Sequence, residues 1–535
     1  MNKNDDAVLK AALNDWRDVL GEERVITDAD ELNRRGSTTY GEVEIPAVLL
    51  PHTTEQVSAA LKVANQHGVP VYTISTGKNW GYGSGAPKCD GCVVMDLSGL
   101  NQIHRFDEKF GTITVGPGVT FGMAEELLEA NHSTHFIAAP GTVPEASLIG
   151  NIMDRGWGYG PYSDRFDFAC GMEVVLADGS IVEMGNARFP GSLSADIFKW
   201  GVGPWLDGLF TQSNFGVVTR MTIFLAPLPS FLGSYIWRVD NPEKLPILID
   251  VFRDLRMKQI IRTNFKIQNF HRVLQNYERW PGEVGEAHLH GDLLKEKMDQ
   301  YGIGFWNGSG ALYCWSEDHY KAEREIVDAA LRPYVDVLLW IDEEVVANQE
   351  KLAPQVKEET GYDLSEVIPH FFTESRIIGI DHGDVLEAYY HKQFTPEHSD
   401  IDGDRVGMAW VDPIVPLSAG HATTVLGIVE DVMNKHHFET NLGFNVVTER
   451  AMFGTCLLLW DRDREGDDER GLACLQELTE RLMDAGYTLG RVANPVMQEV
   501  MDRGQPEANK LLATIKDAVD PNGILSPGRY EPTRD

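Results

Sequence analysis

A glycine-rich stretch directly after a short apolar segment is the feature that most constrains the fold of this chain. Residues 71–75 have the apolar, β-branched composition of a buried strand, and residues 76–85 contain four glycines in ten positions. Because glycine leaves the backbone uncovered, consecutive N–H groups of such a loop can converge on an anion. The loop has neither Walker nor GxGxxG spacing, so a phosphate-binding loop and a tight surface turn both fit it.

Three further loops of small residues each adjoin a predicted strand. Residues 116–118 follow the strand 112–115, residues 140–160 form a long loop with five glycines, and residues 208–216 lead into the strand 217–225. Several backbone-rich loops at strand ends suit an extended ligand with a pyrophosphate in its middle. The pattern therefore predicts a nucleotide cofactor.

These segments resemble the FAD-binding domain of the vanillyl-alcohol oxidase and p-cresol methylhydroxylase flavoproteins, a family that includes eugenol oxidase. The similarity extends over nearly the whole chain and includes the tail DPNGILSPGR at residues 520–529. The resemblance implies an α+β protein in three parts. Residues 1–228 would form a PCMH-type FAD-binding domain, residues 229–490 a substrate or cap domain, and residues 491–535 a segment that returns to the FAD domain.

The local patterns indicate the same α+β class. The sequence TTEQ at residues 53–56 is typical of a capping box, and it opens a helix that Gly68 ends. Residues 178–179, Asp-Gly, mark a hairpin turn. After residue 231 a strand–helix–strand pattern occurs three times, which predicts one mixed or antiparallel sheet backed by helices. The acidic loop 461–470 is predicted to be a solvated turn.

Composition restricts the partners and the compartment. The net charge of −34 argues against nucleic acid and anionic membranes as partners. The N-terminal sequence has no apolar signal core, and no run reaches the roughly 18 to 20 apolar residues of a membrane span, so we expect a cytoplasmic protein. Cys89 and Cys92 form a CxxC without a second ligand pair, so we expect a plain turn there and no metal site.

The resemblance implies FAD as the cofactor and implies which residues hold it. In such enzymes the flavin performs the redox step, while the protein supplies binding, orientation and electrostatics. The positions that would contact FAD are Ser75, Thr76, Gly77, Lys78, Asn79, Gly81, Pro140, Gly141, Thr142, Ser147, Gly150, Asn151, Gly158, Tyr159, Val217, Arg491 and Arg529.

The resemblance also implies a set of catalytic residues. In the family a para-substituted phenol binds as its phenolate, held by two tyrosines and an arginine, and loses hydride from its benzylic carbon to the flavin. Tyr82 matches the first tyrosine, Arg491 the arginine and Tyr159 a further active-site tyrosine. Such a site is physically coherent, because a buried anion needs paired charge and a guanidinium stays protonated.

Asp412 is a fourth candidate, and two positions depart from the family pattern. A carboxylate at Asp412 could act as general base if burial raises its pKa, although a salt-bridged aspartate at a strand end is the alternative. Gly490 stands where the second clamp tyrosine should directly precede the arginine, which predicts a pocket that is wider on that side. Thr142 replaces an acid near the flavin of the oxidase branch.

The flavin is predicted to be held without a covalent bond. Met408 falls at or near the histidine that links the flavin in the oxidase branch, and no tyrosine stands where the methylhydroxylase branch has its link. His391, His398 or Tyr390 would have to reach the flavin for a covalent bond to form.

We therefore expect an FAD-dependent oxidase or dehydrogenase that takes hydride from an alcohol or benzylic carbon of a lignin-derived phenolic or aromatic compound, with room for a bulky dimer. Its electrons would pass to O2, a cytochrome or another acceptor, and the family suggests a homodimer. The alternative is oxidation of a non-phenolic 2-hydroxy acid whose carboxylate is clamped by Arg491. A flavin-binding protein without turnover is the non-enzymatic alternative.

Overall fold

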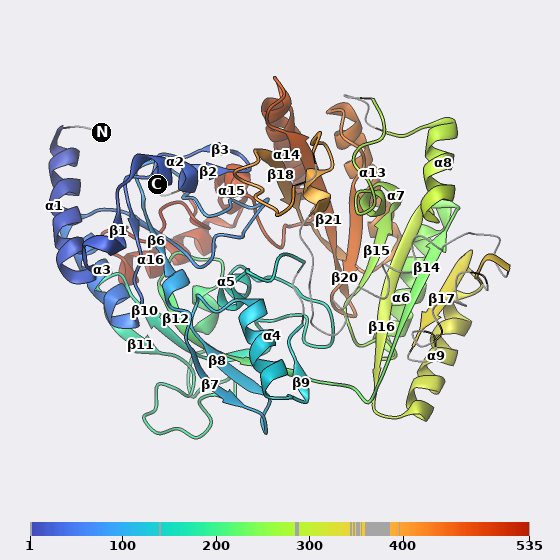
Figure 1. Cartoon of the computed structure of the whole chain (residues 1–535), viewed down its shortest axis with the longest axis horizontal. Helices are drawn as coiled ribbons and strands as arrows, with labels where there is room; N and C mark the ends of the chain where they lie inside the picture. The colour runs from blue at the N-terminus through green and yellow to red at the C-terminus, as the bar shows by residue number, and fades with distance from the viewer. Residues whose placement is uncertain are drawn as a thin grey trace.

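The computed structural model places two halves side by side along the long axis of the molecule, with both chain ends in the first half (Figure 1). Helices and separate sheets occur in both halves, which confirms the predicted α+β class. Among the described residues, no helix combines the length and apolar character needed to cross a bilayer. The structure describes residues 3–138, 141–283, 288–342, 386–394 and 396–533, together with residues 345, 348, 354 and 356–358.

Two sheets form the first half. One has the strand order β1-β4-β6-β5 and contains parallel pairs, and the other is antiparallel with the order β11-β10-β12-β8-β7. Their strands are β1 (Val25–Ile26), β4 (Val48–Leu49), β5 (Val71–Ile74), β6 (Val93–Asp96), β7 (Ile103–Asp107), β8 (Thr112–Val115), β10 (Ala169–Val175), β11 (Ile181–Glu183) and β12 (Val217–Phe224). The remaining elements of this half are α1 (Lys3–Leu20), α2 (Ala29–Gly36), α3 (Thr54–His67), α4 (Phe121–Ala130), α5 (Leu148–Met153) and the strand pairs β2 (Ser37–Thr38) with β3 (Gly41–Glu42) and β9 (His135–Phe136) with β13 (Ala226–Pro227).

The helix predicted after the capping sequence is α3. Thr53 accepts a hydrogen bond from the backbone N–H of Gln56 at 3.2 Å, and Gly68 ends the helix in the left-handed conformation with φ 66°. The Gln56 side chain accepts from the N–H of His52 at 2.8 Å, one residue further back than a capping box requires. Local sequence therefore determines both ends of this helix.

The second half is built on one eight-stranded sheet whose pairings are all antiparallel. Its order is β17-β14-β16-β15-β20-β21-β18, with β19 paired to β21. The strands are β14 (Phe231–Val239), β15 (Phe265–Asn269), β16 (Trp306–Cys314), β17 (Val337–Ile341), β18 (Val406–Val411), β19 (Ile414–Pro416), β20 (Leu442–Val446) and β21 (Ala451–Asp461). The helices are α6 (Leu245–Met257), α7 (Phe270–Leu274), α8 (Gly291–Tyr301), α9 (Glu317–Leu331), α13 (Ala419–Lys435) and α14 (Asp467–Asp484).

The two faces of this sheet differ in chemistry. In β15, Phe265 and Ile267 join the core beneath α6, α13 and α14, whereas Lys266 and Gln268 line a cavity on the opposite face. Successive side chains of a strand point to opposite faces, so every second residue of the central strands faces the first half of the molecule. The face of the sheet under the helices is thus apolar, and the face toward the cavity, called its polar front, is polar.

The last 40 residues return to the first half through α15 (Met497–Asp502) and α16 (Pro506–Val519). The backbone of residues 524–526 pairs with Val71 through two hydrogen bonds of 2.8 Å, which attaches the tail to β5. Lys516 is buried, with its Nζ 2.6 Å from Asp520 Oδ2 and 2.7 Å from the carbonyl oxygen of Asn214. Because this buried ammonium is paired, it stabilises the position of the tail beside the first glycine-rich loop.

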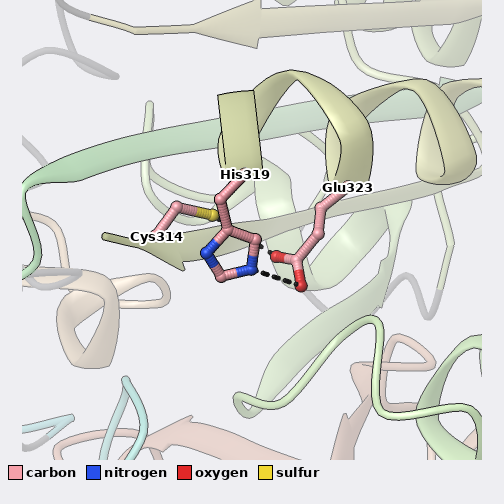
Figure 2. A group of neighbouring side chains, drawn as sticks. All are labelled: Cys314, His319 and Glu323. Carbon is pink, nitrogen blue, oxygen red and sulfur yellow. Dashed lines mark hydrogen bonds and ion pairs between the residues drawn. The ribbon is translucent and has the colours of Figure 1, made fainter. Parts of the chain in front are cut away.

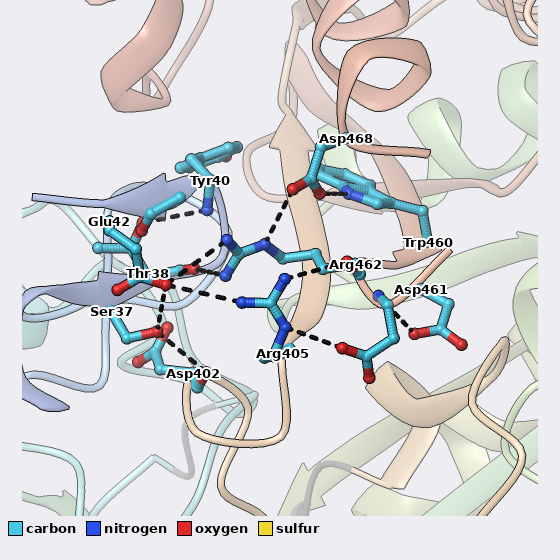
Figure 3. A network of polar contacts seen from close by, with 12 residues as sticks. Ser37, Thr38, Tyr40, Glu42, Asp402, Arg405, Trp460, Asp461, Arg462 and Asp468 are labelled. Carbon is cyan, nitrogen blue, oxygen red and sulfur yellow. Dashed lines mark hydrogen bonds and ion pairs between the residues drawn. The ribbon is translucent and has the colours of Figure 1, made fainter. Parts of the chain in front are cut away.

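The predicted solvated turn at residues 461–470 is wrong for its first part. Arg462 is buried and donates to the carbonyl oxygen of Thr38 at 2.5 Å (Figure 3). Arg405 donates to Asp463 at 2.8 Å. Figure 3 shows both guanidiniums between the second half and the β2–β3 hairpin of the first. A run of charged letters looks solvated in sequence, but these charges find partners on a segment about 400 residues away along the chain.

Candidate active site

One cavity of about 760 Å³ lies between the two halves. The first half lines it with backbone-rich loops, and the second half lines it with the polar front of its sheet. Most of the residues that reach it from the first half fall within 72–84, 141–159 and 210–218, with Leu97 and Pro117 in addition, and the tail contributes Leu525, Ser526 and Arg529. A cavity of this size suits a large cofactor or a drug-sized ligand.

Small residues keep the first wall of the cavity open. The backbone N–H of Ser147 donates to Thr76 Oγ1 at 3.1 Å, which joins the first glycine-rich loop to the start of α5. A Cβ on Gly85 would lie 3.3 Å from the Cα of Gly77, and one on Gly150 would overlap the Ser75 hydroxyl. Larger side chains would close this slot, so its shape and exposed backbone fit an extended dinucleotide such as FAD.

Nearly all the residues predicted to contact the cofactor line this cavity. Gly81 is not among its described lining residues; its backbone turns with φ 76° against the side chain of Trp410. Pro140 lies outside the described residues. The others that line the cavity are Ser75, Thr76, Gly77, Lys78, Asn79, Gly141, Thr142, Ser147, Gly150, Asn151, Gly158, Tyr159, Val217, Arg491 and Arg529.

A buried carboxylate, Asp154, organises two arginines at the floor of the cavity. Arg491 donates to Asp154 Oδ2 through Nε at 3.0 Å and Nη2 at 2.5 Å, and Arg529 donates to Oδ1 at 2.9 Å. Burial alone would raise the pKa of Asp154, but the two guanidiniums hold it below its ordinary value. Asn79 accepts a further hydrogen bond from Arg491 at 2.6 Å. Two cations against one anion leave a net positive charge.

Tyr82 and Asp412 form a second buried pair. The Tyr82 hydroxyl donates to Asp412 Oδ2, and the Arg491 guanidinium stacks 3.7 Å above the centre of the Tyr82 ring. Burial raises the pKa of Asp412 to about 6. Burial, together with the adjacent Asp412, also raises the pKa of Tyr82. Asp412 Oδ1 has no hydrogen-bond partner in the part of the chain that the structure describes.

The backbone brings Asp412 beside Arg491. Asp412 follows β18 directly, and its carbonyl oxygen accepts from the N–H of Gly490 at 2.9 Å. Tyr82 sits in the glycine-rich loop of the other half, and the N–H of Asn494 donates to its carbonyl oxygen at 2.8 Å. Three of the four predicted catalytic residues therefore meet at one place, although they lie far apart in sequence.

Tyr159, the fourth, lines a different part of the same cavity. Its hydroxyl lies 3.6 Å from the position that a Cβ on Gly141 would take. The Lys266 amine lies 4.2 Å from the centre of its ring, a cation–π arrangement across the two walls. This contact joins the first half to the eight-stranded sheet of the second half; the second half is called the cap from here on.

Comparison with known proteins agrees with this geometry. A family of FAD binding domains matches residues 45–185. The 1'-carboxy-chondrochloren decarboxylase of Chondromyces crocatus is 36% identical over 98% of this chain and 97% of the relative. The chain belongs to the vanillyl-alcohol oxidase/p-cresol methylhydroxylase family. The 4-cresol dehydrogenase flavoprotein subunit of Pseudomonas putida is 29% identical over 97% of this chain and 94% of its own. The crystal structure of p-cresol methylhydroxylase with substrate bound has a TM-score of 0.86 at 28% identity, covering 98% of this chain and 97% of that one.

Membership of the vanillyl-alcohol oxidase/p-cresol methylhydroxylase family makes FAD the cofactor and the chain an FAD-dependent oxidoreductase. The narrow glycine-lined slot and the positive Asp154 cluster are consistent with a dinucleotide whose phosphates are anionic. The family resemblance read from the sequence is therefore confirmed.

The wider pocket predicted at Gly490 is wrong. A Cβ on Gly490 would overlap the ring of Phe453, whose Cζ would lie 2.9 Å away. Phe453 comes from β21, lines the cavity and packs against Trp157 with ring centres 5.4 Å apart. The Phe453 ring thus fills the space next to Gly490. Where the family pattern has a tyrosine, this chain has a ring without a hydroxyl.

Asp402 is a half-buried residue that the sequence did not single out as functional. It accepts from Trp80 Nε1 at 3.0 Å and from the Ser84 hydroxyl at 2.6 Å, on either side of Tyr82. Burial raises the pKa of Asp402 to about 6. The cap therefore fixes the loop that carries Tyr82 through one carboxylate.

The three residues considered for a covalent flavin link do not line the described part of the cavity. His391 instead lies 3.1 Å from Glu439, in a cluster with Trp280. Tyr390 is fully buried and His398 is exposed. Met408, at the position expected for the linking histidine, does line the cavity, and a thioether side chain offers no such bond.

A Cys–His–Glu group elsewhere in the cap resembles a metal site but has other partners. Cys314 ends β16, while His319 and Glu323 lie one turn apart on α9 and point toward it (Figure 2). Glu323 already pairs with Arg262 at 2.5 and 3.0 Å, and it accepts from Cys314 Sγ at 3.3 Å. The paired carboxylate explains the cluster as a packing contact between strand and helix, so we assign it no metal.

Proposed function

We propose that this enzyme removes hydride from an alcohol or benzylic carbon of a lignin-derived phenolic or related aromatic compound. The observation that carries the proposal is the Tyr82–Asp412 pair inside the cofactor cavity. Asp412 is 6% exposed, its pKa is raised to about 6 by burial, and its Oδ1 is unpaired in the described structure. A carboxylate that is ionised at neutral pH and has a hydrogen-bonding position free on one oxygen is suited to take a hydroxyl proton from a substrate.

The residues of the chain would manage the proton and the charge. FAD, when bound, supplies the hydride acceptor. Asp412 Oδ1 would take the proton of the substrate hydroxyl, while Tyr82 keeps its hydrogen bond to Oδ2 and thereby fixes the orientation of the carboxylate. Arg491 stacks on the Tyr82 ring and is held by Asp154, so its charge stabilises negative charge that develops beside the pair.

The substrate side of the cavity supports an aromatic compound. Trp157 and Phe453 form an edge-to-face pair in its lining, and Trp410 lines it from β18. Aromatic walls favour planar rings through stacked or edge-to-face contacts. The relatives named for cresol and p-cresol oxidation support the same substrate class. Because Phe453 fills the space beside Gly490, a bulky dimer would have to extend along the polar front of the cap sheet.

A carboxylated substrate is the second candidate. A relative with 36% identity is named as a decarboxylase of a carboxy compound, and Lys266 and Arg272 line the cap wall of the cavity. Either cation could meet a carboxylate, including that of a 2-hydroxy acid. Arg491, the clamp expected from the sequence, is already engaged by Asp154.

Anaerobic mixing of the FAD-loaded enzyme with matched substrates tests these proposals. The panel contains a 4-alkylphenol, an aromatic alcohol, the methyl ether of each phenol, and the same compounds with a side-chain carboxylate. Loss of the oxidised-flavin absorbance with the phenol and alcohol but not with the carboxylated compounds supports the first proposal. Reduction only by carboxylated compounds supports the second, and release of CO2 then distinguishes oxidative decarboxylation from oxidation of a 2-hydroxy acid. An unbleached flavin with every compound would contradict both.

The electron acceptor and the flavin linkage need separate measurements. We propose non-covalent FAD, because neither Tyr390, His391 nor His398 lines the described part of the cavity. Acid precipitation should leave FAD in the supernatant, whereas a yellow pellet would contradict this. Peroxide formation during turnover distinguishes O2 from a cytochrome or other acceptor, and the predicted homodimer and cytoplasmic location stay predictions.

A further inference from the structure

The CxxC turn brings two thiols together at a place remote from the proposed chemistry. Cys89 Sγ and Cys92 Sγ lie 3.5 Å apart; Cys89 is exposed and Cys92 is buried. Neither residue lines the described part of the cofactor cavity. The other four cysteines, Cys170, Cys314, Cys456 and Cys474, are all buried. Of the six thiols, only Cys89 is therefore open to a reagent in solvent.

The backbone of the turn is fixed in a geometry that keeps the thiols together. Gly91 has φ 83°, the conformation required at the third residue of a type II turn, which glycine adopts without strain. The N–H of Glu44 donates to Asp90 Oδ1 at 2.8 Å, and the N–H of Gly91 donates to the carbonyl oxygen of Glu44 at 3.0 Å. Cys92 directly precedes β6, so one thiol is held in the sheet while the other is at the surface.

The two thiols also differ in their tendency to ionise. The hydrogen bond with Cys92 lowers the pKa of the Cys89 thiol to about 7, and Lys88 adds a favourable charge. The same hydrogen bond and burial raise the pKa of Cys92. The thiolate is the reactive form, so the exposed Cys89 is the nucleophile and the buried Cys92 is placed to react with whatever forms on it.

We propose that Cys89 and Cys92 form a peroxide-reactive dithiol that closes to a reversible disulfide. The Cys89 thiolate attacks one oxygen of a hydroperoxide, the O–O bond breaks, and Cys89 becomes a sulfenic acid as hydroxide or an alkoxide leaves. The sulfur of Cys92 then attacks the Cys89 sulfur, the S–S bond forms and the sulfenic oxygen leaves as water. Two thiols lose two protons and two electrons in total, and hydrogen peroxide is reduced to two waters.

A metal site or a structural turn explains these observations less well. Tetrahedral zinc needs four ligands, and no further His, Cys, Asp or Glu joins the two thiols in a ligating group among the described residues. A turn by itself needs only Asp90 and Gly91 and gives no reason for one exposed thiol to contact one buried thiol. Hydroperoxide is also the product that a flavin oxidase would release, although the proposal does not depend on that activity.

Thiol counting on the full FAD-loaded chain tests the proposal. The reduced protein is treated with a few equivalents of hydrogen peroxide, free thiols are alkylated, and the tryptic peptide that carries residues 89–92 is weighed. We expect two of the six thiols to disappear, the peptide to be two hydrogens lighter, and dithiothreitol to restore both thiols. Alkylation of both Cys89 and Cys92 after peroxide treatment, or a bond from either to another cysteine, would overturn the proposal.

Two matched variants separate the roles of the thiols. Cys92→Ser should stop at the sulfenic acid, which a dimedone adduct on Cys89 reports. Cys89→Ser should leave the remaining five thiols unreacted under the same conditions. The rate of disulfide formation in the wild-type protein is compared with the rate of dimedone labelling of Cys170 and Cys314. If the disulfide formed no faster, the oxidation would be non-selective and the assignment would be contradicted.

Discussion

The two walls of the cofactor cavity are built by different physical means. The wall in the first half is made of backbone and small side chains, such as Gly77 and Gly141 in loops and Gly150 in α5. The cap wall is made of large polar and aromatic side chains, such as Lys266 and Phe453, that project from strands distant in sequence. The first wall can bind a ligand through backbone N–H groups and shape, whereas the second can bind one through charged side chains and aromatic rings.

The two kinds of wall suit two different tasks, namely binding a cofactor that is always the same and binding substrates that differ. A dinucleotide is the same in every member of the family, so a backbone cradle can hold it with little dependence on side chains. Substrates differ, and side chains on alternate positions of an antiparallel sheet can change without altering the fold. The catalytic pair spans the two walls, because Tyr82 belongs to the first and Asp412 to the second.

Removal of the Asp412 carboxylate should give the largest effect and tests whether the cap wall carries the base. Asp412→Asn keeps the shape and one oxygen, so we expect kcat/KM to fall by about 10²- to 10⁴-fold with FAD content unchanged. Asp431→Asn, which removes an exposed carboxylate on α13, is the matched control. If Asp412→Asn retained near-normal steady-state rates, the base would have to lie elsewhere.

Asp154→Asn tests whether the first wall depends on one charge. It leaves Arg491 and Arg529 buried without their anion, so we expect the free energy of unfolding to fall by about 3–5 kcal/mol and FAD to be lost during gel filtration. Urea denaturation and the FAD-to-protein ratio measure the two effects. The double variant Asp154→Asn with Arg529→Gln should recover part of the stability, and equal stability of single and double variants would contradict the charge argument.

Gly490→Ala tests whether Phe453 fills the space beside Gly490 on the cap wall. The added methyl meets the Phe453 ring, so we expect a loss of about 1–3 kcal/mol in thermal or urea unfolding. The loss should largely vanish in a Phe453→Ala background. Gly427→Ala is the matched control, because Gly427 is an exposed position of α13 where an added Cβ meets nothing within 4 Å, so the substitution should stabilise slightly. If Gly490→Ala left the free energy of unfolding unchanged, the Phe453 ring would be free to move away from the added methyl.

The pH dependence gives the smallest effect and separates Asp412 from Asp402, two carboxyls whose pKa values are both raised. The base form of Asp412 is needed, so kcat/KM should fall about tenfold per pH unit below pH about 6 and be flat above it. Asp402→Asn should leave this midpoint in place, although Asp402 has a similar pKa. Because the pKa of each carboxyl is raised on folding, the stability that each contributes is present below pH ~4 and lost as pH rises through about 6. If the midpoint of the kcat/KM profile moved in Asp402→Asn, the profile would report the titration of Asp402 and not that of Asp412.

Local patterns predicted much of the fold. The ends of α3, the hairpin at residues 178–179 and the three strand–helix–strand units are present, because short-range caps, turns and side-chain alternation decide them. The wrong predictions concern space and solvent. Gly490 suggested an empty volume that Phe453 fills, and the loop starting at Asp461 looked solvated but is partly buried against the first half.

The sequence by itself determined the family, the cofactor and the glycine-lined loops that accept it, because these depend on contiguous residues whose backbone freedom can be read from their identity. Only the tertiary structure decided that Asp154 joins Arg491 to Arg529, that Tyr82 donates to Asp412, and that Phe453 occupies the space beside Gly490. These partners are separated by 37 to 375 residues, and nothing in their local sequence specifies which of the many buried charges and rings they will meet. Burial then sets their protonation, because the pKa of a carboxyl depends on the solvent and charges that the fold removes or supplies.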